Sequence, residues 1–257
     1  MKRLAKNTLS LSLFMALILV LSANAFTPTV LYGQDYPTAP TSAGYLSNLE
    51  DKLSEYPGAN IDWYLSDPDA NEFYIGTPAE LWGLAYLVNK EIEDPPLSGW
   101  VWTVDFEGKT INLTSDIDLS SPNNGYTTRN NTYGEAWVSI GWGLYVRLPE
   151  MLPGAPGDAP FKGTFDGNGY TISGLADRSL FGMIRNATIK NLSTSGTVGK
   201  REQIGGFRIA GVVNSAVDST LSNLSSDVNL VYNADTMLPV GGIVAEALGN
   251  TTVTGCV

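Results

Sequence analysis

The sequence contains no histidine and a single cysteine among its 257 residues. The missing histidine excludes mechanisms in this chain that use an imidazole as general base or metal ligand, including Ser-His-Asp triads and ordinary zinc enzymes. One cysteine excludes an internal disulfide framework. Basic residues are also few: 15 Lys and Arg stand against 26 Asp and Glu, a formal net charge of −11. Such an acidic chain is not expected to bind nucleic acid, whose binding proteins carry a basic surface.

Long apolar runs are confined to the first 25 residues, which are predicted to be a secretory signal peptide. A basic start precedes an apolar stretch from Leu9 to Leu21, and Ala23 and Ala25 form a small-residue cleavage site. The alternative, a membrane anchor, is disfavoured because a spanning helix needs about 20 apolar residues. The mature chain is therefore predicted to be secreted and to have no membrane span.

Residues 26–60 are predicted to form a polar leader and a short amphipathic helix. The first part is polar and rich in proline. Leu46, Leu49 and Leu53 then recur at helical spacing among charged residues, which predicts a helix over Ser42–Tyr56.

Residues 61–160 are predicted to form an N-terminal capping region with one clear helix at about 77–89. Thr77 is the predicted N-cap, Pro78 suits the first helical position, and Glu80 completes a capping box. Asn89 is the predicted stop. The apolar stripe expected to cover the end of a β structure consists of Leu81, Leu84, Ala85 and Val88.

Short strands separated by turn residues make up the rest of this region. The predicted strands are Phe73–Ile75, Trp100–Val104, Thr110–Thr114 and Trp137–Ile140, and the predicted surface loops are Ser120–Gly134 and Leu144–Pro160.

From residue 161 onward the sequence repeats itself. The segment 189–193 returns at 221–225 and again at 253–257, each copy 32 residues after the last. Glycine-led apolar runs lie between the copies. Fixed periods of this size indicate a solenoid or propeller, and strands of four to six residues favour a parallel β-solenoid over a helical repeat.

A parallel β-solenoid would bring equivalent residues of successive copies into register, about 4.8 Å apart. Asn191 and Asn223 would then form a polar ladder at a corner. Cys256 would be a small core residue rather than a reactive thiol. The positions expected to stack inward are Ile189, Leu192, Leu221, Leu224, Val253 and Cys256.

These segments resemble bacterial surface proteins with GLUG-type repeats, which are adhesin-like and also flank some immunoglobulin A peptidases. The resemblance lies in 161–175, 180–182 and 189–192, and upstream in 75–89 and 108–119. It implies a secreted or wall-associated, mainly β protein: a right-handed parallel β-helix over 161–257 with an N-terminal α/β capping segment. It brings no catalytic residues. Because a solenoid needs a cap on its last turn, we expect the repeats to be truncated at the C-terminus.

Two acidic motifs are candidate sites. Asp166 and Asn168, in Asp-Gly-Asn-Gly, resemble a calcium loop, but the remaining ligands are missing, so a tight turn is the favoured interpretation. Asp116 and Asp118 share a strand face and resemble the paired acids of glycoside hydrolases, but no partner acid, Arg or Lys is identifiable. Solvated or turn-capping acids are the favoured interpretation.

All six tryptophans lie between Trp63 and Trp142. Core packing in the capping region is the favoured explanation. The alternative is contact with a glycan, for which Trp100 and Trp102 are the candidates because they share a strand face.

The sequence therefore predicts a non-catalytic, secreted or cell-surface structural and adhesive module, with no catalytic, metal or cofactor site. Its loops would bind a host glycan or protein, or the cell wall. The alternatives are a polysaccharide lyase or hydrolase of the β-helix type and a tryptophan-based carbohydrate-binding module.

Overall fold

The structure is a computed structural model, and it describes residues 49–50, 53, 58–89, 92–93, 101–102, 104–120, 137–141, 159–199, 208–231 and 239–257. For 92–93 and 101–102 it describes the backbone alone. All of these residues belong to one compact unit, residues 33–257. The described part is mainly β, with parallel sheets.

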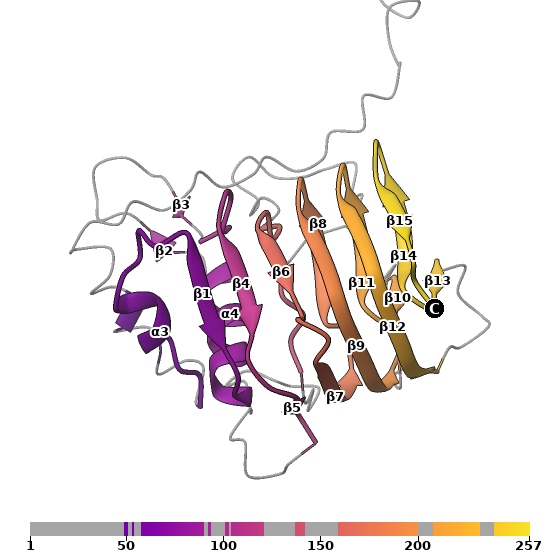
Figure 1. Ribbon diagram of the computed structural model, residues 1–257, viewed down its shortest axis with the longest axis horizontal. Coiled ribbons are helices and arrows are strands. Elements are labelled where there is room, and N and C mark those ends of the chain that lie inside the picture. Colours follow the sequence, from indigo (N-terminus) through magenta and orange to yellow (C-terminus); the bar gives the residue numbers. More distant parts are fainter. Residues whose placement is uncertain are drawn as a thin grey trace, which may run out of the picture. The chain divides into compact units, whose positions relative to one another are not determined.

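The largest sheet of the described part has eight strands, and every pair of neighbouring strands in it is parallel (Figure 1). Its strands follow one another in space in the order of the sequence, so the chain advances steadily along the sheet. The main path is β1 (Glu72–Ile75), β4 (Thr110–Leu113), β6 (Thr164–Asp166), β9 (Thr188–Val198), β12 (Thr220–Leu230) and β15 (Thr252–Thr254). Off this path, β5 (Ile117–Asp118) pairs with β7 (Thr171–Asp177), which pairs with β9.

Between successive strands of the large sheet, the chain forms strands of two smaller parallel sheets. One has three strands, β8 (Phe181–Arg185), β11 (Val213–Val217) and β14 (Val244–Leu248), and the other pairs β10 (Ile209–Ala210) with β13 (Val240–Gly241). The path from β9 through β10 to β11 is thus repeated from β12 through β13 to β14. A β-helix is compatible with this path.

The predicted register of the repeat is confirmed. Leu221 in β12 lies opposite Ile189 in β9 on one side and opposite Val253 in β15 on the other. Because the side-chain period of a strand is two, a slip by one residue would turn every apolar side chain outward. The 32-residue spacing therefore keeps the apolar residues of successive strands on one face.

Four of the six predicted inward positions are buried. Ile189 and Leu221 are 0% exposed, Leu192 is 2% exposed and Leu224 is 1% exposed. Cys256 is half-buried and packs against this core. The burial predicted for Val253 is wrong: its side chain is 43% exposed, because β15 has a described partner strand on one side alone.

The helix α4 (Pro78–Asn89) begins with the predicted capping box. The Glu80 carboxylate accepts hydrogen bonds from the amides of Gly76 and Thr77, at 2.9 and 3.0 Å, and the Glu80 amide donates to the Thr77 hydroxyl at 3.3 Å. These bonds satisfy amides that a helix leaves unpaired at its start.

The predicted single apolar stripe of α4 is too narrow, because every residue from Leu81 to Val88 is buried. Trp82 packs against Trp137, with ring centroids 5.4 Å apart. On another side a Cβ at Gly83 would lie 2.0 Å from the Asn60 carbonyl oxygen, so only glycine fits there. The helix is therefore enclosed by neighbouring segments rather than laid on the end of a β structure.

Asn89 ends α4, as predicted, and also joins the helix to the β structure. Its side-chain amide donates to the Ser139 carbonyl at 2.8 Å and accepts from the Gly141 amide at 2.9 Å. The intervening Ile140 forms a parallel bridge to Phe181 on its other side. The Asn89 side chain thus takes the place of a partner strand at this edge.

Several predictions concern residues outside the described ones. These are the signal peptide, the leader, most of the helix at Ser42–Tyr56 and nearly all of the loops Ser120–Gly134 and Leu144–Pro160. Of the predicted strand at 100–104, the described residues form β3 (Val101–Trp102), which pairs antiparallel with β2 (Ile92–Glu93). The predicted strand at 137–140 is shorter than expected and contributes one bridge at Ile140. The short helix α3 (Asp62–Leu65) lies before β1, and Leu49 and Glu50 are also helical.

The inward placement of Leu221 predicts that substitutions at two neighbouring residues of β12 change the free energy of unfolding by very different amounts. Leu221→Ala leaves a cavity beneath the large sheet and is expected to lower the free energy of unfolding by about 2–5 kcal/mol. Ser222→Ala, on the outer face, is expected to change it by less than about 0.5 kcal/mol. Urea unfolding followed by circular dichroism measures both, and equal effects would contradict the inward placement of Leu221.

Candidate functional site on the outer face of the large sheet

A column of threonines runs along the outer face of the large sheet. Register pairs place them opposite one another on five successive strands of the main path. They range from half-buried to exposed, and the last two hydroxyls lie 3.5 Å apart. We call this set the threonine column; it consists of Thr110, Thr164, Thr188, Thr220 and Thr252.

The threonine column was not predicted. Its signal is present in the sequence, because a threonine stands immediately before the repeated apolar residue at 188, 220 and 252. The 32-residue period predicts the inward apolar residues, and the same period at the preceding, outward position gives the threonines.

A second outward column lies two residues further along each strand and contains an ion pair. Asp166 on β6 lies opposite Lys190 on β9, and the Lys190 Nζ is 3.0 Å from the Asp166 Oδ2. The Lys190 side chain is 37% exposed and that of Asp166 is 13% exposed. The second column consists of Tyr74, Asn112, Asp166, Lys190, Ser222 and Thr254.

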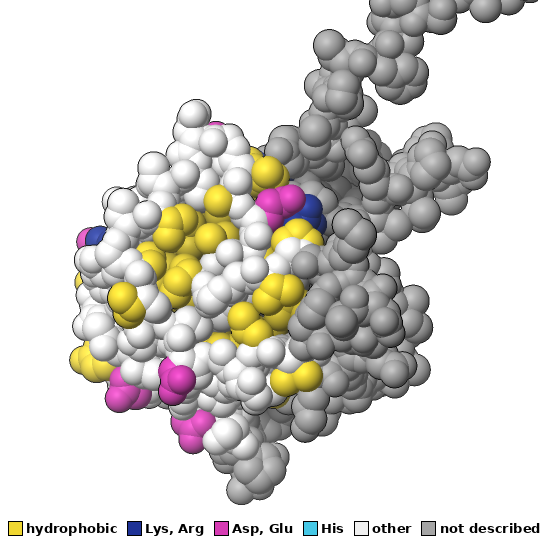
Figure 2. All heavy atoms as spheres, turned by 90° about the vertical axis from the view of Figure 1, so that its right-hand side faces the viewer, with side chains coloured by type: hydrophobic (Ala, Val, Ile, Leu, Met, Phe, Trp, Pro, Cys, Tyr) yellow, Lys and Arg dark blue, Asp and Glu magenta, His cyan; other side chains and the backbone are white. Residues whose placement is uncertain are grey.

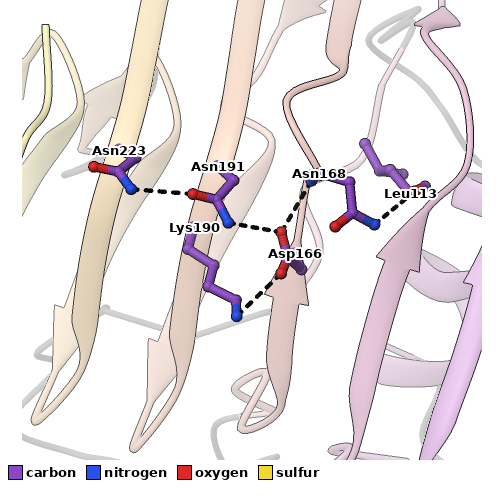
Figure 3. A network of polar contacts seen from close by, with 6 residues as sticks. All are labelled: Leu113, Asp166, Asn168, Lys190, Asn191 and Asn223. Atoms are coloured by element: carbon purple, nitrogen blue, oxygen red, sulfur yellow. Dashed lines mark hydrogen bonds and ion pairs between the residues drawn. The ribbon is translucent and has the colours of Figure 1, made fainter.

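Asparagines form the predicted polar ladder at the corner next to this column (Figure 3). The Asn223 side-chain amide donates to the Asn191 side-chain oxygen at 3.1 Å, and the Asn191 side-chain amide donates to the Asp166 Oδ1 at 3.0 Å. Asn191 and Asn223 have φ of 53° and 52°, and Gly255 follows at the equivalent position with φ of 63°. Asparagine and glycine tolerate this left-handed conformation better than other residues, so the backbone bends there.

Asp166 is the residue on which the network of Figure 3 converges. Its Oδ1 also accepts a hydrogen bond from the Asn168 amide at 2.9 Å, and the Asn168 side chain in turn donates to the Leu113 carbonyl. Partial burial raises the pKa of Asp166, but the hydrogen bonds from Asn168 and Asn191 and the charge of Lys190 outweigh it, so the net pKa lies below the ordinary value. Asp166 is therefore a stable carboxylate rather than a proton donor.

The segment Asp166–Gly169 is a tight turn, as predicted. Asn168 and Gly169 have φ of 50° and 83°, and the turn joins β6 to β7. The Asp166 carboxylate is directed to the Asn168 amide and to Lys190. Within the described residues, no group of three or more Asp, Glu or Cys side chains is placed to hold a metal ion.

Asp116 and Asp118 are both exposed, and Asp118 caps a turn, as predicted: its Oδ1 accepts from the Ser120 amide at 2.9 Å. The Asp116 Oδ1 instead accepts from the Thr171 amide at 2.8 Å, a bond between segments 55 residues apart. The hydrogen bonds from Ser120 hold the pKa of Asp118 below its ordinary value. Both acids lie on the exposed side of β5, and each one organises backbone.

Three of the six tryptophans are described, and all three pack inside the molecule. Trp82 and Trp137 are 0% and 1% exposed, and Trp63 stacks on Phe106 with ring centroids 6.0 Å apart. Core packing is confirmed for these three. The side chains of Trp100 and Trp102 lie outside the described residues, so glycan contact there remains a prediction.

The most deeply buried ion pair among the described residues joins Asp105 and Lys162. The Lys162 Nζ lies 3.0 Å from the Asp105 Oδ2, and the two side chains are 11% and 2% exposed. Phe106 and Phe161 pack next to the pair, with ring centroids 6.1 Å apart. Burial, and then the nearby charges of Asp69 and Asp105, raise the pKa of Tyr64 to about 12. This cluster is enclosed in the core and stabilises the junction between β6 and the preceding segments.

Comparison with known proteins gives one weak similarity. No family model matches the chain, and no solved structure matches it. The chain is 26% identical to Halomucin from Haloquadratum walsbyi over 162 residues, which cover 55% of this chain and 2% of Halomucin. This similarity is compatible with a surface or repeat protein. Among the described helices, none has the length and apolar character needed to cross a membrane.

The polar network predicts a pH-dependent contribution from Asp166. A carboxylate whose folded pKa is lowered stabilises the fold above its unfolded pKa, and this contribution is lost as the pH falls through the folded value. Asp166→Asn is expected to lower the free energy of unfolding by about 1 kcal/mol at pH 7. The difference from wild type should shrink as the pH falls below the ordinary pKa of an aspartic acid and through the lower folded pKa of Asp166.

Urea unfolding at a series of pH values measures this difference. Asp227→Asn, which removes one charge from an exposed position on β12, is the matched control. A difference between wild type and Asp166→Asn that is the same at pH 7 and pH 3 would contradict the network.

Proposed function

We propose that this chain is a non-catalytic structural and adhesive module of a secreted or cell-surface protein. In this proposal the parallel sheets form a right-handed parallel β-helix, and α4 belongs to an N-terminal capping segment. Right-handed crossovers are expected because about 98% of parallel crossover connections have that hand. The observation that carries the proposal is the register of β9, β12 and β15, in which equivalent residues stack at a 32-residue period.

Regular stacking favours a structural role, because each unit binds the next through both main-chain hydrogen bonds and apolar contacts. β9 and β12 pair over almost their whole length, and Val213 in β11 lies between Phe181 in β8 and Val244 in β14. Such a stack presents a long, ordered outer surface while its core needs only neighbouring units.

The hydrogen bonds and ion pairs made by the aspartate side chains support a role without catalysis. Asp116 and Asp118 accept bonds from backbone amides, and Asp105 is paired inside the core. Asp166 and Lys190 lie on neighbouring strands, as the acid and base of a β-helix lyase would, yet each neutralises the other at 3.0 Å. A general base has to be able to accept a proton from the substrate, whereas the Asp166 carboxylate is already paired with the Lys190 ammonium group.

Three observations support a location outside the cell. The similarity to Halomucin is compatible with a surface or extracellular protein. The first 25 residues have the pattern of a secretory leader. The outer face of the large sheet carries hydroxyl and amide groups in regular columns, which suits a hydrated surface.

Binding partners in this proposal are neutral and polar: a glycan of a host or of the cell wall, or a host protein. The threonine column and the amides of Asn191 and Asn223 offer uncharged hydrogen-bonding groups. The predicted contacts in the capping region are the loops Ser120–Gly134 and Leu144–Pro160. Trp100 and Trp102 are the contacts of the alternative, a tryptophan-based carbohydrate-binding module.

The proposal predicts binding to cell-wall or host polysaccharides without their cleavage. The purified chain, incubated with a panel of insoluble polysaccharides, is expected to sediment with at least one and to release neither reducing ends nor unsaturated sugars. A loss of about tenfold or more in Trp100→Ala with Trp102→Ala would favour the alternative, a tryptophan-based carbohydrate-binding module. Val231→Ala, at a 38% exposed apolar residue after β12, is the control.

Release of sugar products that stops in Lys190→Ala or Asp166→Asn would replace this proposal with a lyase or hydrolase. Failure to sediment with any polysaccharide or to bind host protein would remove the adhesive role.

A further inference from the structure

The ion pair between Asp105 and Lys162 is almost entirely removed from water. The Lys162 Nζ lies 3.0 Å from the Asp105 Oδ2, and the Asp105 side chain is 2% exposed while that of Lys162 is 11% exposed. The adjoining residues Phe106 and Phe161 add two buried aromatic rings, with centroids 6.1 Å apart. Two charges that lose their hydration are costly to keep in a core, so a reaction that turns this pair into a neutral group is favoured by burial.

The backbone holds the two side chains next to each other. The Lys162 amide donates to the Asp105 carbonyl at 2.7 Å. A Cβ at the following Gly163 would lie 2.8 Å from the Phe106 carbonyl oxygen, so the two segments approach as closely as glycine allows. Groups that the fold keeps in contact react with one another far faster than the same groups free in solution. The amine and the carboxyl group are therefore placed for a reaction within the chain.

Glu107 contacts both members of the pair. Its backbone amide donates to the Asp105 Oδ1 at 3.0 Å, and its Oε2 lies 3.9 Å from the Lys162 Nζ. The amide can stabilise negative charge that develops on Oδ1. The Glu107 carboxylate is 64% exposed, and it can carry a proton away from the Lys162 nitrogen.

Two other ion pairs of the described residues are more open to water. The Lys190 side chain is 37% exposed beside Asp166, and the paired side chains of Arg208 and Glu246 are 16% and 24% exposed. Figure 2 shows acidic and basic side chains reaching the surface on one face of the molecule. Water solvates the charges of such pairs and screens their attraction. The pair at Asp105 differs from them in burial, although the Asp166 pair has the same separation of 3.0 Å.

We infer that the side chains of Asp105 and Lys162 join through an amide bond, which links the segment before β4 covalently to the segment before β6. The ammonium group first gives one proton to the Asp105 Oδ2, leaving a neutral amine and a neutral acid. The Nζ electron pair then forms a bond to the Asp105 Cγ, and the carbonyl electron pair moves onto Oδ1. Glu107 transfers one proton from the nitrogen to Oδ2, the Cγ–Oδ2 bond breaks, the carbonyl forms again and Oδ2 leaves as water. One ammonium and one carboxylate thus become one amide and one water molecule, with no other reactant.

A cross-link of this kind suits the chain, because a single cysteine cannot form an internal disulfide. The amide closes a loop of chain that includes both predicted surface loops, Ser120–Gly134 and Leu144–Pro160. Like a disulfide, it restricts the unfolded chain, and it also replaces two buried charges with a neutral group. The cross-link does not depend on which molecule the outer face binds.

Mass spectrometry of the purified, folded chain after trypsin digestion tests the cross-link. Trypsin cuts after Lys and Arg, and a Lys162 whose Nζ is part of an amide is no longer cut. We expect one species in which residues 91–109 are joined to residues 148–178, with the summed mass of the two peptides less one water molecule. Separate peptides 91–109 and 148–162, with no joined species, would overturn the inference.

Lys162→Arg is the most informative variant, because a guanidinium keeps the positive charge opposite Asp105 but stays protonated and cannot attack the carboxyl group. It should release 91–109 as a separate peptide. Lys190→Arg, which changes the exposed pair with Asp166, is the matched control and should keep the joined species in full. Circular dichroism verifies that each variant is folded.

Glu107→Gln, at an exposed side chain, tests the proton transfer without disturbing the core. In a time course after cell-free synthesis, it should slow the appearance of the joined species at least about 100-fold. An unchanged rate would overturn the role of Glu107, and a joined species that persists in Lys162→Arg would overturn the assignment of the bond to Lys162.

Discussion

Parallel pairing between like segments of the repeat is the interaction on which the rest of the structure depends. Leu221 lies opposite Ile189 and Val253 because β9, β12 and β15 hydrogen-bond in a single register. That register assigns every neighbouring residue to the core or to the outer face. It puts the threonine column outward, and it leaves an apolar end wherever a unit has no further partner.

Corners keep this register intact. At Asn191 and Asn223 the backbone turns through a left-handed residue, and apolar side chains on both sides of the turn remain buried. The same two side chains hydrogen-bond to each other and to Asp166, so the bend is held by polar contacts outside while packing holds it within. The ladder formed by Asn223, Asn191 and Asp166 therefore helps to align successive units, which otherwise contact one another mainly through the edges of their strands.

Features that repeat or follow local rules were predictable from the sequence. The 32-residue period predicted the register and the asparagine ladder, and the Thr77 and Glu80 pattern predicted the start of α4. Burial that depends on distant segments was not predictable. Gly83 and Trp82 read as part of an ordinary helix, but Asn60 and Trp137 enclose them from far along the chain. Val253 matched the core pattern, yet its exposure depends on whether another strand lies beside it.

The same constraint links the fold to the proposed function. A stack of paired strands offers ordered hydroxyl and amide columns for adhesion. Solution NMR tests the stack most directly, through nuclear Overhauser contacts among the amide and α protons of Ile189, Leu221 and Val253. The account predicts the parallel pattern, with Leu221 in contact with both of the others. An antiparallel pattern, or no contact among the three residues in the folded protein, would contradict it.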